Sequence, residues 1–230
     1  TNVRKTWLLV AVFLVVVIGI GYVFAQVYGS SNFLYVAILF ALAMNFVSYW
    51  WSDTIVLKMA GAKPASREEY FDLYTVVENL SITAGLPKPK VYVINDPAPN
   101  AFATGRDKEH AAVAATTGLL KMMDRSELEG VMAHELSHVG NRDILLSTVI
   151  VVLVGFISIL ADWFLRAQLF GSRDDREGNG NAVFLLLGVV LAVLSPIVAT
   201  LMQLAISRRR ELLADSSGAL LTRYPEGLAR

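Results

Sequence analysis

A run of 47 uncharged residues, from Thr6 to Ser52, limits this chain more than any other feature of its sequence. A helix needs about 20 apolar residues to cross a bilayer, so the run is long enough for two crossings. A cluster of turn-forming residues at 28–32 divides it, which predicts a helical hairpin over residues 7–27 and 33–51. A cleaved signal peptide ending near residue 25 is the competing interpretation of the first half.

Two further uncharged runs, at residues 144–161 and 178–207, predict a second hydrophobic hairpin. The first of these is near the lower length limit for a crossing, so a hairpin buried beside a polar domain is the alternative. Between the hairpins the chain is polar, because 23 of its 40 charged residues lie from Asp53 to Asp143. The expected divisions are therefore a transmembrane hairpin at 1–57, a polar domain at 58–143, the second hairpin at 144–206 and a return to the polar domain at 207–230.

Lysine and arginine are concentrated on one side of the expected spans; the loop between the last two spans has three arginines, offset by four acidic residues. Arg4 and Lys5 precede the first span, the turn at 28–32 carries no basic residue, and the arginines at 208–210 follow the last span. Basic residues favour the cytosolic side of a membrane, so the polar domain is expected in the cytosol. The formal net charge is zero and cysteine is absent, which disfavours nucleic-acid binding and excludes disulfides and Cys-ligated metals.

The polar domain has the pattern of an α+β fold with a small sheet. Ser66 begins a capping-box pattern for a helix over residues 65–84, and Ser126 begins another for a helix that ends with Gly140 as its C′ residue. Short strands are expected at residues 91–94, 101–104 and 110–116. The whole chain is thus expected to be a mostly helical α+β membrane protein with about four transmembrane helices.

The second of these helices carries the sequence HELSH at residues 134–138. Helical positions four apart share a face, so His134 and His138 can hold one Zn²⁺ while Glu135 reaches a water on the metal. These are two of only three histidines in the chain, and the charged start of the helix keeps it outside the bilayer. Two solvated histidines on an ordinary surface helix are the alternative.

A catalytic zinc ion needs a third protein ligand, and Glu211 is the natural candidate. It follows the second hairpin, which returns the chain to the side that it left. Asp215 lies four residues later on the same helical face, where it can orient a ligand histidine. Asp143 is excluded because it would lie about 180° from His134 on a continued helix. His110 is next in line as the ligand, and a juxtamembrane basic cluster with incidental acids is the alternative reading of residues 208–215.

The combined motifs resemble the HtpX-type membrane-bound zinc metalloproteases, heat-shock proteases related to the CAAX prenyl proteases. The resemblance rests on two N-terminal spans, a hydrophobic hairpin, PNAFATG at 99–105, HELSH at 134–138 and SRRRELLAD at 207–215. It implies a gluzincin-like site with His134, His138 and Glu211 on zinc, Glu135 as general base and Asp215 beside a ligand. Leu212 stands where the family usually has an aromatic residue. The chain begins without methionine and stops at Arg230, which indicates a fragment.

The resemblance also implies a metalloendopeptidase of the cytoplasmic (inner) membrane that degrades misfolded or damaged membrane proteins under stress. Substrate peptide is expected to bind along a strand edge, near Asn100, Ala101, Phe102, Ala103 and His110. The candidates for stabilising the oxyanion are His110, Asn100, Arg208 and Tyr224. Two alternatives stay open: a catalytically inactive zinc-binding membrane scaffold, and a metal sensor or transporter, which would have no need of a Glu135 free of the metal.

Overall fold

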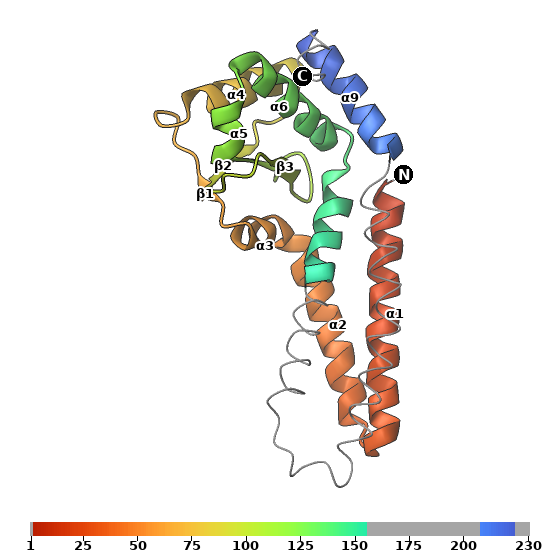
Figure 1. Cartoon of the computed structure of the whole chain (residues 1–230). Coiled ribbons are helices and arrows are strands. Elements are labelled where there is room, and N and C mark those ends of the chain that lie inside the picture. The colour runs from red at the N-terminus through yellow and green to blue at the C-terminus, as the bar shows by residue number, and fades with distance from the viewer. Residues whose placement is uncertain (1, 156–207, 224–230) are drawn as a thin grey trace.

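The computed structural model describes residues 2–155 and 208–223. Two long helices, α1 (Asn2–Tyr28) and α2 (Asn32–Trp50), run antiparallel and project from a polar domain (Figure 1). They approach closely at Gly21, where an added Cβ would lie only 2.1 Å from the Cβ of Ala37. Small residues at a helix crossing allow such contact, which is common between membrane helices. The helical hairpin that the uncharged run predicts is therefore present.

In the described part of the chain, one helix, α2, is long and apolar enough by itself to cross a membrane. A shorter apolar stretch, Thr6–Gly19, lies within α1. The helix α6 (Arg125–Gly140) and the helix over Ile144–Gly155 meet the same test only as a pair bent by 91°. The rest of the expected second hairpin, from residue 156 to residue 206, lies outside the described residues.

The polar domain contains a four-stranded sheet with the strand order β1-β2-β4-β3. Parallel pairing joins β2 to β4, whereas β1 and β3 pair antiparallel with their neighbours. The three predicted strands are confirmed, although β4 begins two residues later than expected, and β1 is an additional strand of two residues. The strands are β1 (Lys63–Pro64), β2 (Lys90–Ile94), β3 (Ala101–Thr104) and β4 (Ala112–Thr116).

Alternate side chains of β4 enter two different apolar clusters, as the two-residue period of a strand requires. Val113 packs in the main core with Met132 and Leu136 of α6, whereas Ala114 packs against Leu57 on the opposite face. Full burial of side chains such as Met132 and Leu136 contributes about 1.5–3 kcal/mol each, which fixes α6 to the domain. The remaining helices of the domain are α3 (Ser52–Met59), α4 (Phe71–Ala84) and α5 (Thr117–Met122).

The first predicted helix of the domain begins later than its sequence pattern indicates. The Ser66 hydroxyl does accept a hydrogen bond from the Glu69 N–H, at 3.1 Å, as a cap would. The chain nevertheless makes a turn there, because Tyr70 has φ −121° and ψ 52°, outside the helical range, and α4 starts at Phe71. The capping pattern at Ser66 therefore marks a turn before the helix rather than its first residue.

Both ends of α6 also differ from the predicted positions. Asp124, not Ser126, caps the helix: its carboxylate accepts the N–H groups of Ser126 and Glu127, and the Glu127 carboxylate accepts the Asp124 N–H. A carboxylate also interacts favourably with the positive end of the helix dipole. At the other end Gly140 is still helical, and Arg142 is the residue with left-handed backbone, at φ 58°. This turn redirects the chain into the helix over Ile144–Gly155.

Candidate metal centre

His134 and His138 lie one turn apart on the side of α6 that faces α9 (Arg208–Thr222). Their Nε2 atoms are 3.2 Å apart. The Oε2 atom of Glu211 lies 3.4 Å from Nε2 of His134 and 3.7 Å from Nε2 of His138. One candidate ligand atom from each of the three residues thus lies within 4.8 Å of the other two. The structure brings together the three residues that the sequence predicts as metal ligands.

The spacing of these three atoms fits a tetrahedral zinc ion. Zinc binds imidazole nitrogen and carboxylate oxygen at about 2.0–2.1 Å, so tetrahedral neighbours lie about 3.3–3.4 Å from each other. The observed separations of 3.2, 3.4 and 3.7 Å fall around that value. Two imidazoles and one carboxylate are also the donor types that zinc takes, and three protein ligands leave a fourth position for a water or a substrate.

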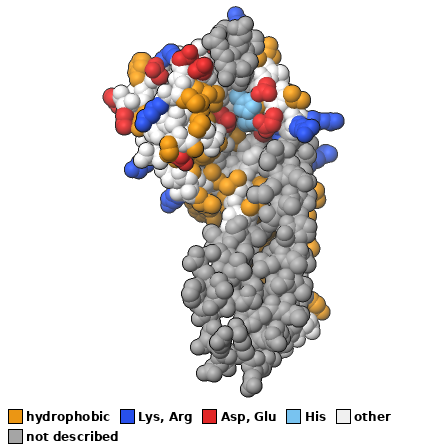
Figure 2. All heavy atoms as spheres, in the orientation of Figure 1, with side chains coloured by type: hydrophobic (Ala, Val, Ile, Leu, Met, Phe, Trp, Pro, Cys, Tyr) orange, Lys and Arg blue, Asp and Glu red, His pale blue; other side chains and the backbone are white. Residues whose placement is uncertain are grey.

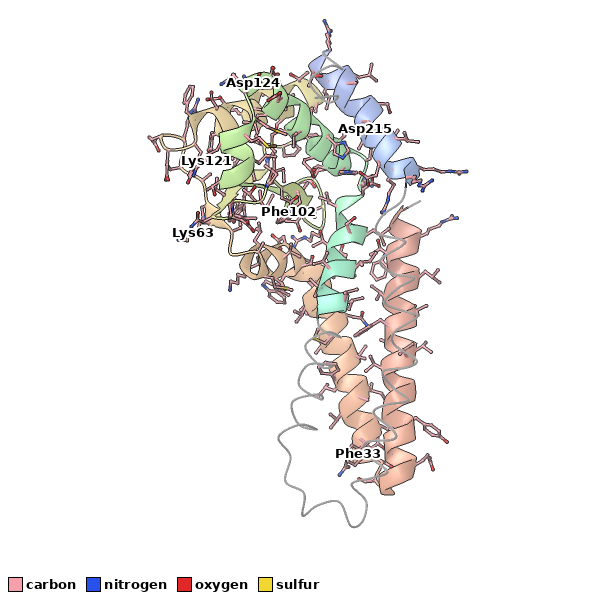
Figure 3. All side chains as sticks on the ribbon, in the orientation of Figure 1. Phe33, Lys63, Phe102, Lys121, Asp124 and Asp215 are labelled. Carbon is pink, nitrogen blue, oxygen red and sulfur yellow. The ribbon has the colours of Figure 1, made fainter. Side chains whose placement is uncertain are left out.

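The outward nitrogen of each histidine meets a carboxylate. Nδ1 of His134 lies 2.8 Å from Oδ1 of Asp215, and Nδ1 of His138 lies 3.3 Å from Oδ2 of Asp143. When each Nδ1–H donates to its carboxylate, the lone pair of Nε2 is directed at the metal position. Figure 3 shows Asp215 on α9, beside α6. Asp215 thus occupies its predicted place.

The two carboxylates differ in their exposure to solvent. The Asp143 side chain is 3% exposed, whereas that of Asp215 is 56% exposed. Burial by itself lowers the pKa of His138, but its hydrogen bond with Asp143 and the charges of Glu135 and Glu211 outweigh this effect and raise that pKa. The hydrogen bond with the buried Asp143 is the largest of the effects that raise the pKa of His138.

The carboxylate of Glu135 contacts β3. Its Oε2 accepts a hydrogen bond from the backbone N–H of Ala103, at 2.9 Å. Burial raises the pKa of the Glu135 carboxyl, and the neighbouring imidazoles and the Ala103 N–H only partly offset it. A carboxylate with a raised pKa, next to a metal site and outside its ligand cluster, has the properties of a general base.

A cavity of about 180 Å³ opens beside Glu135 and His138. Figure 2 shows histidine side chains at the molecular surface with acidic side chains next to them. The cavity joins β3 to the start of α9, so a substrate in it would touch both the strand and the metal ligands. Its lining residues are Ala101, Phe102, Ala103, Glu135, His138, Asp143, Ile144, Ser147, Arg210 and Glu211.

The helices α9 and α6 lie side by side (Figure 1), which brings Glu211 and Asp215 to the histidines. Gly218 allows this approach, because an added Cβ would lie 3.1 Å from the backbone nitrogen of His134 and 3.3 Å from the carbonyl carbon of Ala133. Ala214, one turn earlier on α9, is fully buried. Small residues thus form the contact face of α9, as close helix packing requires.

The structure places three of the five predicted substrate-binding residues at the cavity, namely Ala101, Phe102 and Ala103. Asn100 does not line this cavity; its backbone N–H donates to the hydroxyl of Thr116, at 2.9 Å. That bond ties the residue before β3 to β4.

His110 lies away from the metal centre, in the loop between β3 and β4. Its Nδ1 is 2.5 Å from Oδ1 of Asp107, and its Nε2 is 2.7 Å from a guanidinium nitrogen of Arg106. Neither the three-residue ligand cluster nor the cavity beside Glu135 includes it. Glu211, and not His110, is the third member of the cluster with His134 and His138.

Two residues near the cluster, Asp143 and Arg210, were not predicted from the sequence. Asp143 was excluded on the assumption of a continued helix, but α6 ends at Gly140, and the turn brings Asp143 back to His138. Arg210 belongs to the basic triplet at 208–210, which sequence alone explains as a juxtamembrane cluster, yet it is buried and lines the cavity. Of the four predicted oxyanion candidates, Asn100 and His110 do not line the cavity, Arg208 is exposed, and residue 224 lies outside the described residues.

Two histidines one helical turn apart, a carboxylate contributed by a second helix and a glutamate held against an end strand together define a metallopeptidase type of site. The model of peptidase family M48 matches residues 67–230. The chain belongs to that family.

Curated relatives extend the likeness over nearly the whole chain. A "Protease HtpX homolog" of Caldanaerobacter subterraneus is 46% identical over 99% of this chain and 78% of its own length. Proteins with the same description from Tropheryma whipplei and Pyrococcus furiosus are 48% and 47% identical, over 99% and 98% of this chain and 77% and 75% of their own lengths. The crystal structure of S. mikatae Ste24p matches with a TM-score of 0.49 and 21% identity, over 91% of this chain and 52% of that one.

Proposed function

We propose that this membrane-associated protease is a zinc-dependent endopeptidase in which His134, His138 and Glu211 hold the metal and Glu135 is the general base. The observation that carries the proposal is the convergence of the three ligand atoms within 4.8 Å, at spacings that suit tetrahedral zinc. Asp215 and Asp143 keep the two imidazoles in the tautomer that a metal needs, since each accepts from an Nδ1–H.

When bound, zinc would polarise the scissile carbonyl and lower the pKa of a water molecule. The hydrolysis also needs a group that accepts a proton from the attacking water and delivers it to the leaving amine. Glu135 is suited to both tasks. The Ala103 N–H holds one carboxylate oxygen in place, which leaves the other oxygen for the proton. Its raised pKa favours proton uptake as the water attacks.

We propose that the substrate binds as an extended chain along β3. This strand ends the sheet, so its outer edge pairs with no other strand among the described residues, and the Ala103 N–H on that edge is held by Glu135. Peptide added to such an edge is recognised through its backbone, so the selection depends more on unfolded chain than on particular side chains. That mode suits an endopeptidase acting on misfolded or damaged proteins, the quality-control role that the name of the HtpX homologues suggests.

We also propose a membrane setting with four spans in two hairpins. The divisions are the N-terminal hairpin at 1–57, the protease domain at 58–143, the second hairpin at 144–206 and the returning segment at 207–230. Support comes from the span-forming α2 and from the uncharged runs on each side of the polar domain. The distribution of lysine and arginine favours a cytosolic protease domain at the inner membrane, with membrane proteins as substrates.

The substitution Glu135→Gln tests the proposal. It keeps the side-chain volume but removes the base, so the detergent-solubilised variant is expected to hold one equivalent of zinc. Its rate of cleavage of an unfolded protein such as casein is expected to fall about 10²–10⁴-fold. Glu129→Gln, on the same helix, is the matched control and should cleave at the parent rate.

Two results would contradict the proposal. Undiminished cleavage by the zinc-loaded Glu135→Gln variant would remove the general-base role. A parent protein that holds zinc but cleaves nothing, in detergent or in lipid, would instead favour the inactive zinc-binding scaffold.

A further inference from the structure

A second cavity, of about 270 Å³, lies apart from the metal centre where the helical hairpin meets the polar domain. Its wall combines the start of α1, the end of α2, the loop between β3 and β4, and the turn after α6. The charged side chains in this wall are Arg106, Asp107, Lys108, Glu109 and Arg142. Nothing in the proposed hydrolysis uses these residues.

One of the three basic residues is already engaged by its neighbours. The Arg106 guanidinium lies 4.6 Å from the centre of the Trp50 ring, and its Nε is 3.2 Å from a carboxylate oxygen of Asp107. Within residues 2–155 and 208–223, by contrast, no ion pair or side-chain hydrogen bond involves Lys108, Arg142 or the second acid of the wall, Glu109. The cavity thus has two uncommitted positive charges against one negative charge.

The backbone of Arg142 adds an independent observation. Its φ of 58° is left-handed, a conformation that glycine or asparagine adopts with less strain. Left-handed backbone at a residue other than glycine costs free energy and persists only where the surrounding structure holds it. Arg142 also lines the cavity, which places a basic residue at this turn beside the space.

Aromatic side chains mark the level of the cavity relative to a membrane. Trp7 and Tyr49, both in the cavity wall, stack with their ring centres 6.0 Å apart. Trp50 and Trp51 follow at the end of α2 and are largely exposed. Tryptophan and tyrosine gather where membrane helices enter the headgroup region. Ile144 and Leu145 line the same cavity, and their apolar side chains suit the first methylene groups of a lipid's acyl chains.

We propose that this cavity binds the phosphate group of an anionic membrane phospholipid, with Arg142 and Lys108 contacting the phosphate. Cations at the membrane surface attract anionic headgroups, and the uncommitted charges of the cavity sum to one positive charge. The inference rests on the proposed membrane setting of α1 and α2 and is independent of the proposed hydrolysis. A bound lipid would join the helical hairpin to the turn that carries Asp143.

The test measures the binding of short-chain phosphatidylglycerol to the full chain in a neutral detergent, through the fluorescence of tryptophans near the cavity. Arg142→Gly removes the guanidinium and relieves the left-handed backbone. Arg223→Gly is a closely matched control, because Arg223 also has left-handed backbone, at φ 54°, and does not line this cavity. Arg142→Gly is expected to weaken binding at least tenfold, and Arg223→Gly should bind like the parent.

Lys108→Ala provides a second variant that leaves the turn after α6 intact, and it should also weaken phosphatidylglycerol binding. Equal affinity in all variants, or equal losses in Arg142→Gly and Arg223→Gly, would overturn the proposal. Inorganic phosphate in excess distinguishes a lipid site from a free-phosphate site: displacement of the lipid by phosphate would overturn the lipid assignment. The inactive Glu135→Gln variant should bind the lipid like the parent. Lipid binding and peptide hydrolysis are thus measured independently, so either proposal can fail without the other.

Discussion

Gly218 allows a quantitative test of how closely α9 must approach α6. A Cβ at this position would meet backbone atoms of His134 and Ala133 at 3.1 and 3.3 Å, and backbone atoms cannot rotate away. The helices must therefore separate by a few tenths of an ångström. Metal–ligand distances tolerate only about 0.2 Å, so Gly218→Ala is expected to lower zinc affinity about tenfold.

The same substitution should leave the metal-free fold nearly unchanged in stability. Alanine gains about 1 kcal/mol of helix propensity over glycine, which offsets the tighter contact. Gly218→Val adds two more methyl groups, and overpacking of this kind costs about 1–3 kcal/mol. Zinc affinity is therefore expected to fall in the order glycine, alanine, valine, whereas the unfolding temperature of the metal-free protein falls clearly only for valine.

Competition with a chromophoric chelator measures the zinc affinity, and thermal unfolding in detergent measures the stability. Ser216→Ala is the control on the same helix, because Ser216 is exposed and its hydroxyl bonds only to carbonyl groups of α9 among the described residues. It should bind zinc like the parent. If both Gly218 variants also bind zinc like the parent, the close packing of α9 does not position Glu211, and the reasoning is refuted.

Two other substitutions test the surroundings of the metal. Asp143→Ala is expected to lower zinc affinity about 10–100-fold. The loss should be larger than that of Asp215→Ala, because solvent screens the exposed Asp215. A larger loss for Asp215→Ala would contradict this ranking. Thr148→Val keeps the volume but removes the hydroxyl that meets the Thr104 hydroxyl, at 3.0 Å, and the Gly105 N–H, at 3.3 Å. The free energy of unfolding should fall by about 1–3 kcal/mol. Because β3 loses a hydrogen bond that holds it to the neighbouring helix, KM should rise by a larger factor than kcat falls. An unchanged KM would contradict substrate binding along β3.

The three-residue cluster that we propose as the metal centre could be predicted from sequence because its spacing is local or fixed by topology. His134 and His138 share a helical face at any point along a regular helix, so their separation of four residues suffices. Glu211 required one further step, the return of the chain after two hydrophobic runs, and the structure places it 3.4 Å from His134. The strand at 101–104 was equally readable, because apolar residues there precede a turn with a glycine.

Asp143 could not be placed in the same way, since its position depends on where a helix stops. A continued helix would turn it away from His134, whereas the left-handed Arg142 and the 91° bend direct it to His138. Arginine carries no sequence signal for left-handed backbone, so the expected end at Gly140 was the more natural reading. The cap of α6 was ambiguous for a similar reason: Asp124 and Ser126 both precede a glutamate by three residues, and only the folded turn selects Asp124.

The most direct test of the zinc site is the metal content of Glu211→Ala beside that of the parent and of Glu129→Ala. All three proteins are solubilised in the same detergent, checked for the same folded state and titrated with a chelator. The parent and Glu129→Ala are expected to retain one equivalent of zinc at chelator concentrations that strip Glu211→Ala, whose site keeps only two histidines. If Glu211→Ala retains a full equivalent and cleaves protein at the parent rate, Glu211 is not a ligand and the proposed metal centre is wrong.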